Sequence, residues 1–201
     1  MTTWAIVVAA GRGERFGRPK QYEVIAGKRV LDWSVDDAGA ACDGVIVVVP
    51  PGEDGGVEGG DTRSASVRNG LAAVPDDADV IVVHDAARPA AGVALFRSVI
   101  DAVRAGADAA IPGIPVTDTL KRVEGPTVVE TLDRDALVVV QTPQAFTAAA
   151  LRAAHASGED ATDDAALVER AGGRVVVVPG HVDNRKLTHP SDVVALEAVL
   201  R

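Results

Sequence analysis

The chain has 201 residues, of which 47% are hydrophobic and 24% charged, the balance of a globular protein able to bury a full core. Its 20 Lys plus Arg against 29 Asp plus Glu give a formal net charge of −9, which disfavours a protein that wraps nucleic acid through a basic surface. Aromatic residues make up only 3%, which also disfavours base-stacking platforms for single strands. The single Cys42 excludes an internal disulfide. With neither a signal peptide nor a membrane span recognisable, we expect a cytoplasmic protein with no membrane or nucleic-acid partner.

Short Val/Ile runs alternate along the chain with Gly-rich or polar turns and helical stretches. We predict strands at residues 4–9, 45–49, 80–83, 108–111, 137–140 and 175–178. We predict helices at residues 31–40, 64–73, 93–104, 148–155, 163–171 and 191–200, the fifth beginning with a cap at Thr162 followed by Asp163 and Asp164. The clearest strands lack polar alternation, which is typical of strands covered on both faces. The sequence therefore predicts an α/β fold, a doubly wound three-layer αβα sandwich with a mostly parallel sheet.

Two stretches interrupt this alternation. Residues 50–61 (PPGEDGGVEGGD) are too rich in Gly and Pro for a regular element, and we expect a surface loop beyond a strand end, where ligands bind in open α/β sheets. Residues 119–132 (TLKRVEGPTVVETL) indicate two short strands around a Gly-Pro turn. A lone hairpin is marginal in water, so a second subunit is a plausible partner for it. We expect one domain, residues 1–201, with the hairpin forming an arm at about 116–136.

The strongest local signal for chemistry is the segment after the first predicted strand, residues 9–20 (AAGRGERFGRPK). It combines three glycines with four cations, Arg12, Arg15, Arg18 and Lys20. Free N–H groups and positive charge suit a polyphosphate. The spacing is neither that of a P-loop nor the dinucleotide fingerprint, because the glycines run G-x-G-x-x-x-G. The ordinary alternative is a glycine turn with solvated arginines, but four cations together in a chain of charge −9 favour an anionic ligand.

Three further segments carry weaker signals. Residues 59–67 (GGDTRSASV) could recognise a base edge or could simply hold a helix cap at Asp61 or Thr62. In HDAARP, Asp85 and Arg88 follow a strand end, where an acid can bind sugar hydroxyls or orient hydrated magnesium, or can merely form a turn. We interpret His84 as a hydrogen-bonded strand-end residue and Cys42 as a small apolar filler. Lys186 lies in a charged loop of the kind that is usually solvated.

Six motifs together are more specific than any one of them. AAGRGERFGRPKQY, GGDTRSASVRNG, VHDAARP, DTLKR, QTPQAF and DNRKLT occur in the order seen in the 2-C-methyl-D-erythritol 4-phosphate cytidylyltransferase family, which the chain resembles over nearly its whole length. Members have a Rossmann-like nucleotidyltransferase fold. They join CTP to methylerythritol phosphate, release pyrophosphate and serve isoprenoid synthesis by the non-mevalonate route, with help from magnesium.

The resemblance implies a role for each matching residue. It implies CTP contacts at Ala9, Ala10, Gly11 and Gly13, cytosine contacts at Gly60, Asp61, Arg63 and Ser66, and ribose or substrate contacts at Asp85 and Ala86. It implies methylerythritol phosphate contacts at Arg88, Thr119 and Arg134, and a catalytic set of Arg15, Lys20, Arg134 and Lys186. The arm would reach into the partner of a homodimer, so that Thr119 and Arg134 could serve the neighbour's site. Magnesium would be held mainly by the CTP phosphates, and we assign it no protein ligand beyond a possible contribution from Asp85.

The chain departs from the family at residues 16–20 and 50–61, both of which are shorter than usual. Three alternatives remain. The first is a cytidylyltransferase for another polyol phosphate, such as ribitol 5-phosphate. The second is a non-catalytic nucleotide sensor, which the presence of all four catalytic cations disfavours. The third is a dinucleotide-dependent oxidoreductase, for which Asp36 and Asp37 lie at a suitable distance but the glycine spacing is wrong.

Overall fold

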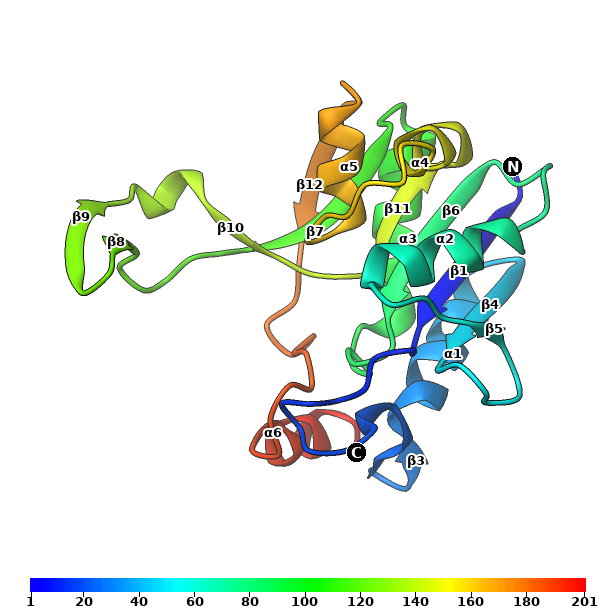
Figure 1. Ribbon diagram of the computed structural model, residues 1–201, viewed down its shortest axis with the longest axis horizontal. Coiled ribbons are helices and arrows are strands. Elements are labelled where there is room, and N and C mark those ends of the chain that lie inside the picture. Colours follow the sequence, from blue (N-terminus) through cyan, green and yellow to red (C-terminus); the bar gives the residue numbers. More distant parts are fainter.

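The computed structural model describes all 201 residues and is built on one eight-stranded sheet (Figure 1). Its strands are β1 (Thr3–Val8), β4 (Gly44–Val49), β5 (Val57–Glu58), β6 (Val80–Asp85), β7 (Ala109–Pro115), β10 (Val138–Val140), β11 (Gln144–Thr147) and β12 (Val175–Pro179). They run in the order β10-β7-β11-β6-β1-β4-β5, and β12 also pairs with β7. The pairs β1–β4, β1–β6, β4–β5 and β7–β12 are parallel, while β10 and β11 are antiparallel to their neighbours.

Helices cover both faces of this sheet. They are α1 (Val30–Ala41), α2 (Arg63–Ala72), α3 (Gly92–Arg104), α4 (Ala148–His155), α5 (Asp164–Arg170) and α6 (Asp192–Val199). One core cluster joins α2, α4 and α5 to one face of the sheet, and a second joins α1 and α3 to the other. The predicted doubly wound three-layer αβα sandwich is therefore confirmed.

The central strands explain why their sequences lack polar alternation. All six residues of β6 are buried, and successive side chains enter opposite cores. Ile81 and Val83 belong to the cluster under α2, α4 and α5, whereas Val80 and Val82 belong to the cluster under α1 and α3. Because both faces are covered, an uninterrupted apolar run is the lowest-energy sequence for such a strand.

The predicted hairpin is confirmed as β8 (Lys121–Glu124) paired with β9 (Thr127–Thr131), followed by a short 3₁₀ helix at Arg134–Ala136. It extends away from the sheet as an arm (Figure 1). Every residue of both strands is exposed, and Val123 and Val128 are each 55% exposed. The arm thus presents apolar side chains that its own chain does not cover.

Several elements differ from the predictions. The loop expected at residues 50–61 contains the two-residue strand β5, and residues 144–147 form β11, which the sequence pattern does not indicate. The same is true of a small hairpin of β2 (Val24–Ile25) and β3 (Lys28–Arg29) and of a 3₁₀ helix at Lys20–Tyr22.

The start of α5 also differs. Its N-cap is Asp163, whose side chain accepts a hydrogen bond from the Ala166 N–H, and not Thr162 as predicted. An aspartate and a threonine are nearly equivalent caps, so the choice depends on tertiary contacts. None of the helices has the length and apolar character needed to span a membrane.

Candidate active site

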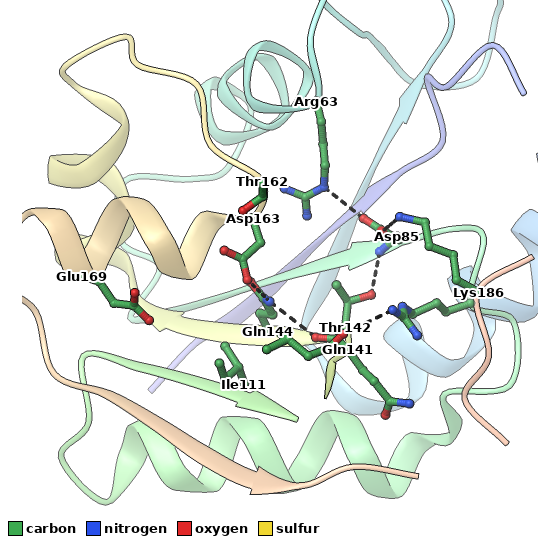
Figure 2. A pocket seen from close by; sticks show the side chains of 12 residues that line it. Arg63, Asp85, Ile111, Gln141, Thr142, Gln144, Thr162, Asp163, Glu169 and Lys186 are labelled. Carbon is green, nitrogen blue, oxygen red and sulfur yellow. Dashed lines mark hydrogen bonds and ion pairs between the residues drawn. The ribbon is translucent and has the colours of Figure 1, made fainter. Parts of the chain in front are cut away.

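Two adjoining cavities open at the ends of β1, β4 and β6. The larger has a volume of about 770 Å³ and lies among residues 8–16, the start of α2 and the residues after β6. The smaller has a volume of about 460 Å³ and lies among β7, the segment 140–144 and the start of α5 (Figure 2). Both volumes fall in the range of ligand sites. Arg63, Asp85 and Lys186 line both cavities and so mark their junction.

The glycine-rich segment after β1 forms one wall of the larger cavity, which is lined by Ala9, Ala10, Gly11, Arg12, Gly13, Arg15 and Lys20. Gly13 has φ +68°, and a Cβ there would lie 2.0 Å from the Arg18 carbonyl oxygen, so only glycine fits this turn. Phe16 anchors the segment because it is buried in a third core cluster with Leu187. Arg18 differs from the expectation, since it pairs with Glu23 and does not line the cavity.

The start of α2 forms the opposite wall, with Gly60, Asp61, Thr62, Arg63 and Ser66 lining the larger cavity. Thr62 is the helix N-cap, because its hydroxyl accepts a hydrogen bond from the Ala65 N–H at 3.0 Å. The Ser66 hydroxyl accepts one from the Gly60 N–H at 3.1 Å. The cap interpretation is thus correct for Thr62, and the same residues also face the cavity.

Asp85 lies at the junction, between two cations (Figure 2). Its Oδ1 accepts from Arg63 Nε at 3.2 Å and its Oδ2 accepts from Lys186 Nζ at 2.6 Å. Burial by itself would raise the pKa of Asp85, but the charges of Arg63 and Lys186 outweigh it and hold that pKa well below its usual range. The carboxylate is therefore ionised whenever both partners are present.

His84 and Thr142 hold Asp85 in place from behind. The Thr142 hydroxyl accepts from the Asp85 N–H at 3.0 Å and lies 3.1 Å from His84 Nδ1, while His84 Nε2 lies 3.2 Å from the Arg88 carbonyl oxygen. Burial lowers the pKa of His84 to about 4. The predicted hydrogen-bonded strand-end histidine is confirmed.

The second lysine, Lys20, is tied to the loop that carries Lys186. Its Nζ donates to the Leu187 carbonyl oxygen at 2.7 Å, and the Leu187 N–H donates to the Ala87 carbonyl oxygen at 2.7 Å. Burial lowers the pKa of Lys20, and the charges of Lys186 and Arg15 lower it further. Mutual repulsion of cations is a sign of a site preorganised for an anion.

Arg88 belongs to the smaller cavity. Its Nη1 donates to the Asn184 carbonyl oxygen at 2.7 Å, and its Nε is buried without a hydrogen-bond partner. Burial lowers the pKa of this guanidinium. A buried cation with an unused donor can serve an incoming anion.

The arm residues lie apart from these cavities. Neither Thr119 nor Arg134 lines either of them, and Arg134 Nη1 donates to the Thr117 carbonyl oxygen at 2.6 Å. The sequence-predicted residues therefore divide into two groups. All but Thr119 and Arg134 gather at the cavities, and those two lie on the arm.

Three residues at the site have no role assigned from the sequence: Gln141, Thr142 and Asp164. Gln141 and Thr142 line the smaller cavity, and Gln141 Nε2 donates to the His181 carbonyl oxygen at 2.8 Å, which fixes the loop before Lys186. Asp164 contacts Arg63 from a helix distant in the sequence. A run of polar residues directly after a Val-rich strand, QTPQ, was the available signal for the first two. Nothing local marked Asp164.

No cluster of three or more His, Cys, Asp or Glu side chains in the structure could hold a metal ion. Both oxygens of Asp85 already accept from cations. Magnesium is commonly bound by one or two carboxylates together with substrate phosphates and water. The donor set therefore fits a metal that arrives with a phosphate ligand and uses at most Asp85.

The glycine-rich cationic loop after β1 faces an ion-paired acid at the end of the neighbouring strand β6, an arrangement typical of phosphate sites at the ligand edge of a doubly wound sheet. With cations gathered where two cavities meet, the fold and site define a nucleotidyltransferase. Residues 3–201 match the family model described as 2-C-methyl-D-erythritol 4-phosphate cytidylyltransferase. The chain belongs to this family.

Individual relatives support the same family assignment. Proteins named 2-C-methyl-D-erythritol 4-phosphate cytidylyltransferase from Streptomyces coelicolor and Rhodococcus jostii are 42% and 44% identical, over 98% of this chain and 84% and 94% of their own lengths. The crystal structure of the enzyme of that name from Thermus thermophilus superposes with a TM-score of 0.85 at 36% identity and 98% coverage of both chains. The Streptomyces alignment spans 228 residues against the 201 of this chain, so that relative has residues without a counterpart here.

Proposed function

We propose that the protein transfers a cytidylyl group from CTP to 2-C-methyl-D-erythritol 4-phosphate, giving a CDP-linked methylerythritol and pyrophosphate. The observation that carries the proposal is the junction of the two cavities, where Asp85 and Lys186 line both cavities and Lys20 lines the larger one beside them. CTP would occupy the larger cavity and the polyol phosphate the smaller one. Membership of the cytidylyltransferase family supports the choice of both substrates.

The reaction needs no covalent nucleophile on the protein. An oxygen of the acceptor phosphate, already anionic at neutral pH, attacks the α-phosphorus of CTP in line, a new P–O bond forms, and the bond to the β-phosphate oxygen breaks to release pyrophosphate. The enzyme must therefore hold two anions that repel each other and neutralise the charge that develops.

Cations around the larger cavity suit this task. Arg15 and Lys20 would stabilise charge at the α-phosphate, and Lys186 would exchange its contact with Asp85 for the attacking phosphate. Ala9, Ala10, Gly11 and Gly13 would offer backbone to the triphosphate. The lowered pKa of Lys20 is consistent with cations brought together before an anion binds.

Base and sugar recognition would come from the other walls. Gly60, Asp61, Arg63 and Ser66 would contact cytosine through the start of α2, and Asp85 and Ala86 would lie at the ribose and the acceptor. Arg88 would bind the acceptor phosphate, for which its buried, unpartnered Nε is available.

Magnesium would be held chiefly by the CTP phosphates, with Asp85 as the one acid at the junction able to approach it. When bound, the ion would neutralise phosphate charge. The protein's own cations, Arg15, Lys20 and Lys186, orient the phosphates independently of it.

A homodimer through the arm would complete the acceptor site. The arm exposes Val123, Val128 and Val129, which a partner subunit would cover. Thr119 and Arg134 would then contribute to the partner's smaller cavity. We place the enzyme in the cytoplasm, without a membrane or nucleic-acid partner, because its one cysteine fits a reducing compartment and its net charge is −9.

The test is pyrophosphate release by the purified protein with magnesium, each of the four nucleoside triphosphates, and either methylerythritol phosphate or ribitol 5-phosphate. We expect release only with CTP plus methylerythritol phosphate. Release with ribitol 5-phosphate would retain the chemistry and overturn the acceptor. CTP binding without release from either acceptor would instead identify a nucleotide sensor.

A further inference from the structure

A buried pair of side chains, on α4 and α5, lies next to the junction of the two cavities without lining either cavity. Asp164 is the first residue of α5 and is 0% exposed, and His155 is the last residue of α4 and is 4% exposed. His155 Nε2 lies 3.0 Å from Asp164 Oδ1. With hydrogen on Nε2 the ring donates to the carboxylate, which leaves Nδ1 as the buried atom without a partner.

This pair connects to the active site through Arg63. Arg63 Nη1 donates to Asp164 Oδ2 at 2.8 Å, while Arg63 Nε donates to Asp85 Oδ1 at 3.2 Å. The result is a continuous series of side-chain hydrogen bonds from His155 through Asp164, Arg63 and Asp85 to Lys186. Each oxygen of both carboxylates has one of these donors, so the orientation of each group depends on its neighbours.

The segment between α4 and α5 also holds the first turn of α2. The Thr62 hydroxyl donates to Asp160 Oδ1 at 2.9 Å, and the Ser64 hydroxyl accepts from the Ala161 N–H at 3.2 Å. Arg68 Nη1 donates to the Glu159 carbonyl oxygen at 3.0 Å. These contacts fix the helix backbone, but only the Asp164 contact acts on the Arg63 guanidinium that reaches the junction.

We propose that Asp164 and His155 are positioning residues for the transfer reaction: they orient Arg63 so that it holds Asp85 in place after Lys186 has moved to a substrate phosphate. The proposal rests on the proposed function. While Lys186 is on Asp85, two cations hold the carboxylate. Once Lys186 has left, Arg63 is the one cation of this pair still bound to Asp85. The other carboxylate that holds Arg63 is Asp164.

His155 matters because Asp164 cannot hold Arg63 in one orientation alone. Without a donor at Oδ1, the buried carboxylate has one unpaired oxygen and is free to rotate toward Arg63 with either oxygen. Arg63 lines both cavities, so its displacement changes the position of groups that meet both substrates. Small misplacements of this kind reduce the rate of the chemical step.

The test uses a matched pair at position 155. His155→Gln can place an amide N–H near the Nε2 position and retain the donor, whereas His155→Leu keeps similar bulk and removes it. We expect His155→Leu to lower kcat/KM on the order of 10-fold, and His155→Gln to remain within about 3-fold of wild type. Asp164→Asn, which removes the charge, should act like His155→Leu. Thermal unfolding checks that each variant is folded at the assay temperature.

A double-mutant cycle with Arg63→Lys separates positioning from general support of the fold. Lysine keeps the charge but cannot reach both carboxylates in the same way. If His155 acts through Arg63, His155→Leu should lower kcat/KM by less than about 2-fold in the Arg63→Lys background. An equal loss in both backgrounds, or unchanged activity of folded His155→Leu and Asp164→Asn, would overturn the proposal. Wild-type enzyme without pyrophosphate release would overturn the proposed function itself.

Discussion

His84 is the residue whose burial has the clearest consequence for stability. Its pKa is about 4 in the fold against an ordinary 6.5, because burial disfavours the charged ring. Between these two values the unfolded chain binds a proton that the folded chain does not. The free energy of unfolding therefore falls as the pH decreases from 6.5 towards 4, and the loss from this group approaches about 3 kcal/mol.

We expect urea unfolding at a series of pH values from 7.5 to 4.5 to show this decline. His84→Asn is the control, because it cannot bind the proton while the other three histidines remain. The variant should be less stable at pH 7.5 and should lose less stability on acidification. Parallel pH dependences in the two proteins would show that His84 is not the group responsible.

At the residue scale, most of the residues singled out from the sequence line one of the two cavities, and their roles there stay predictions. Asp85 was singled out from its place after a Val-rich strand and Lys186 from the family resemblance, and the two form an ion pair at 2.6 Å. Asp164, which contacts Arg63, could not be found in this way. It lies 79 positions from Asp85 in the numbering, and no local pattern distinguishes an acid that caps a helix from one that holds an arginine.

At the scale of elements, the shape of the glycine-rich loop depends on the backbone conformation at Gly13 more than on the number of glycines in the loop. Gly13 and Gly17 both have positive φ, +68° and +88°, but a Cβ on Gly13 would meet the Arg18 backbone whereas one on Gly17 has nothing within 4 Å. Both glycines therefore have a left-handed backbone, and they differ only in the free space around an added Cβ atom. Alanine substitutions at the two positions can measure the effect of this difference.

Gly13→Ala should raise KM for CTP by at least about 10-fold, because the loop must move away from the phosphate position to relieve the contact. Gly17→Ala should cost on the order of 1 kcal/mol of stability from its positive φ and leave KM for CTP within about 3-fold. Steady-state kinetics with CTP varied, together with thermal unfolding, test both. Similar KM values for the two variants would contradict the role given to the Gly13 turn.

The predicted elements also differ in how well the sequence identified them. The strand predicted at residues 80–83 was evident because a parallel strand covered on both faces is apolar on both, and β6 extends it by two polar residues to Asp85. Gln144–Thr147 was not, because only four residues (QAFT) form the strand and its antiparallel place between β6 and β7 depends on pairing with distant chain. Short strands are held by their neighbours, and their own sequence contains little of that information.

At the scale of the whole molecule, the separation of Arg134 from the cavities leads to a test of the dimer. Lys186→Ala should lower turnover about 10²- to 10³-fold, by analogy with the loss of an oxyanion donor, and Arg134→Ala should also be impaired. If Arg134 serves the partner's site, subunit exchange between the two variants creates heterodimers with one intact site each. An equal mixture should regain about a quarter of wild-type turnover.

The measurement is pyrophosphate release before and after the two variants are mixed and allowed to exchange subunits. Each variant incubated alone is the control and should gain nothing. No recovery in a mixture proven to contain heterodimers would show that Arg134 acts within its own subunit or not at all.

The sequence by itself determined the αβα architecture, the hairpin and the order of the motifs, because hydrophobic periodicity, glycine placement and charge are local properties of the chain. Only the tertiary structure decided which charges meet. It set Asp85 between Arg63 and Lys186, and it joined Arg63 to Asp164 across 101 positions of sequence. Such contacts depend on how helices pack on the sheet, and the free energy that fixes them comes from burial and pairing between segments that no local pattern connects.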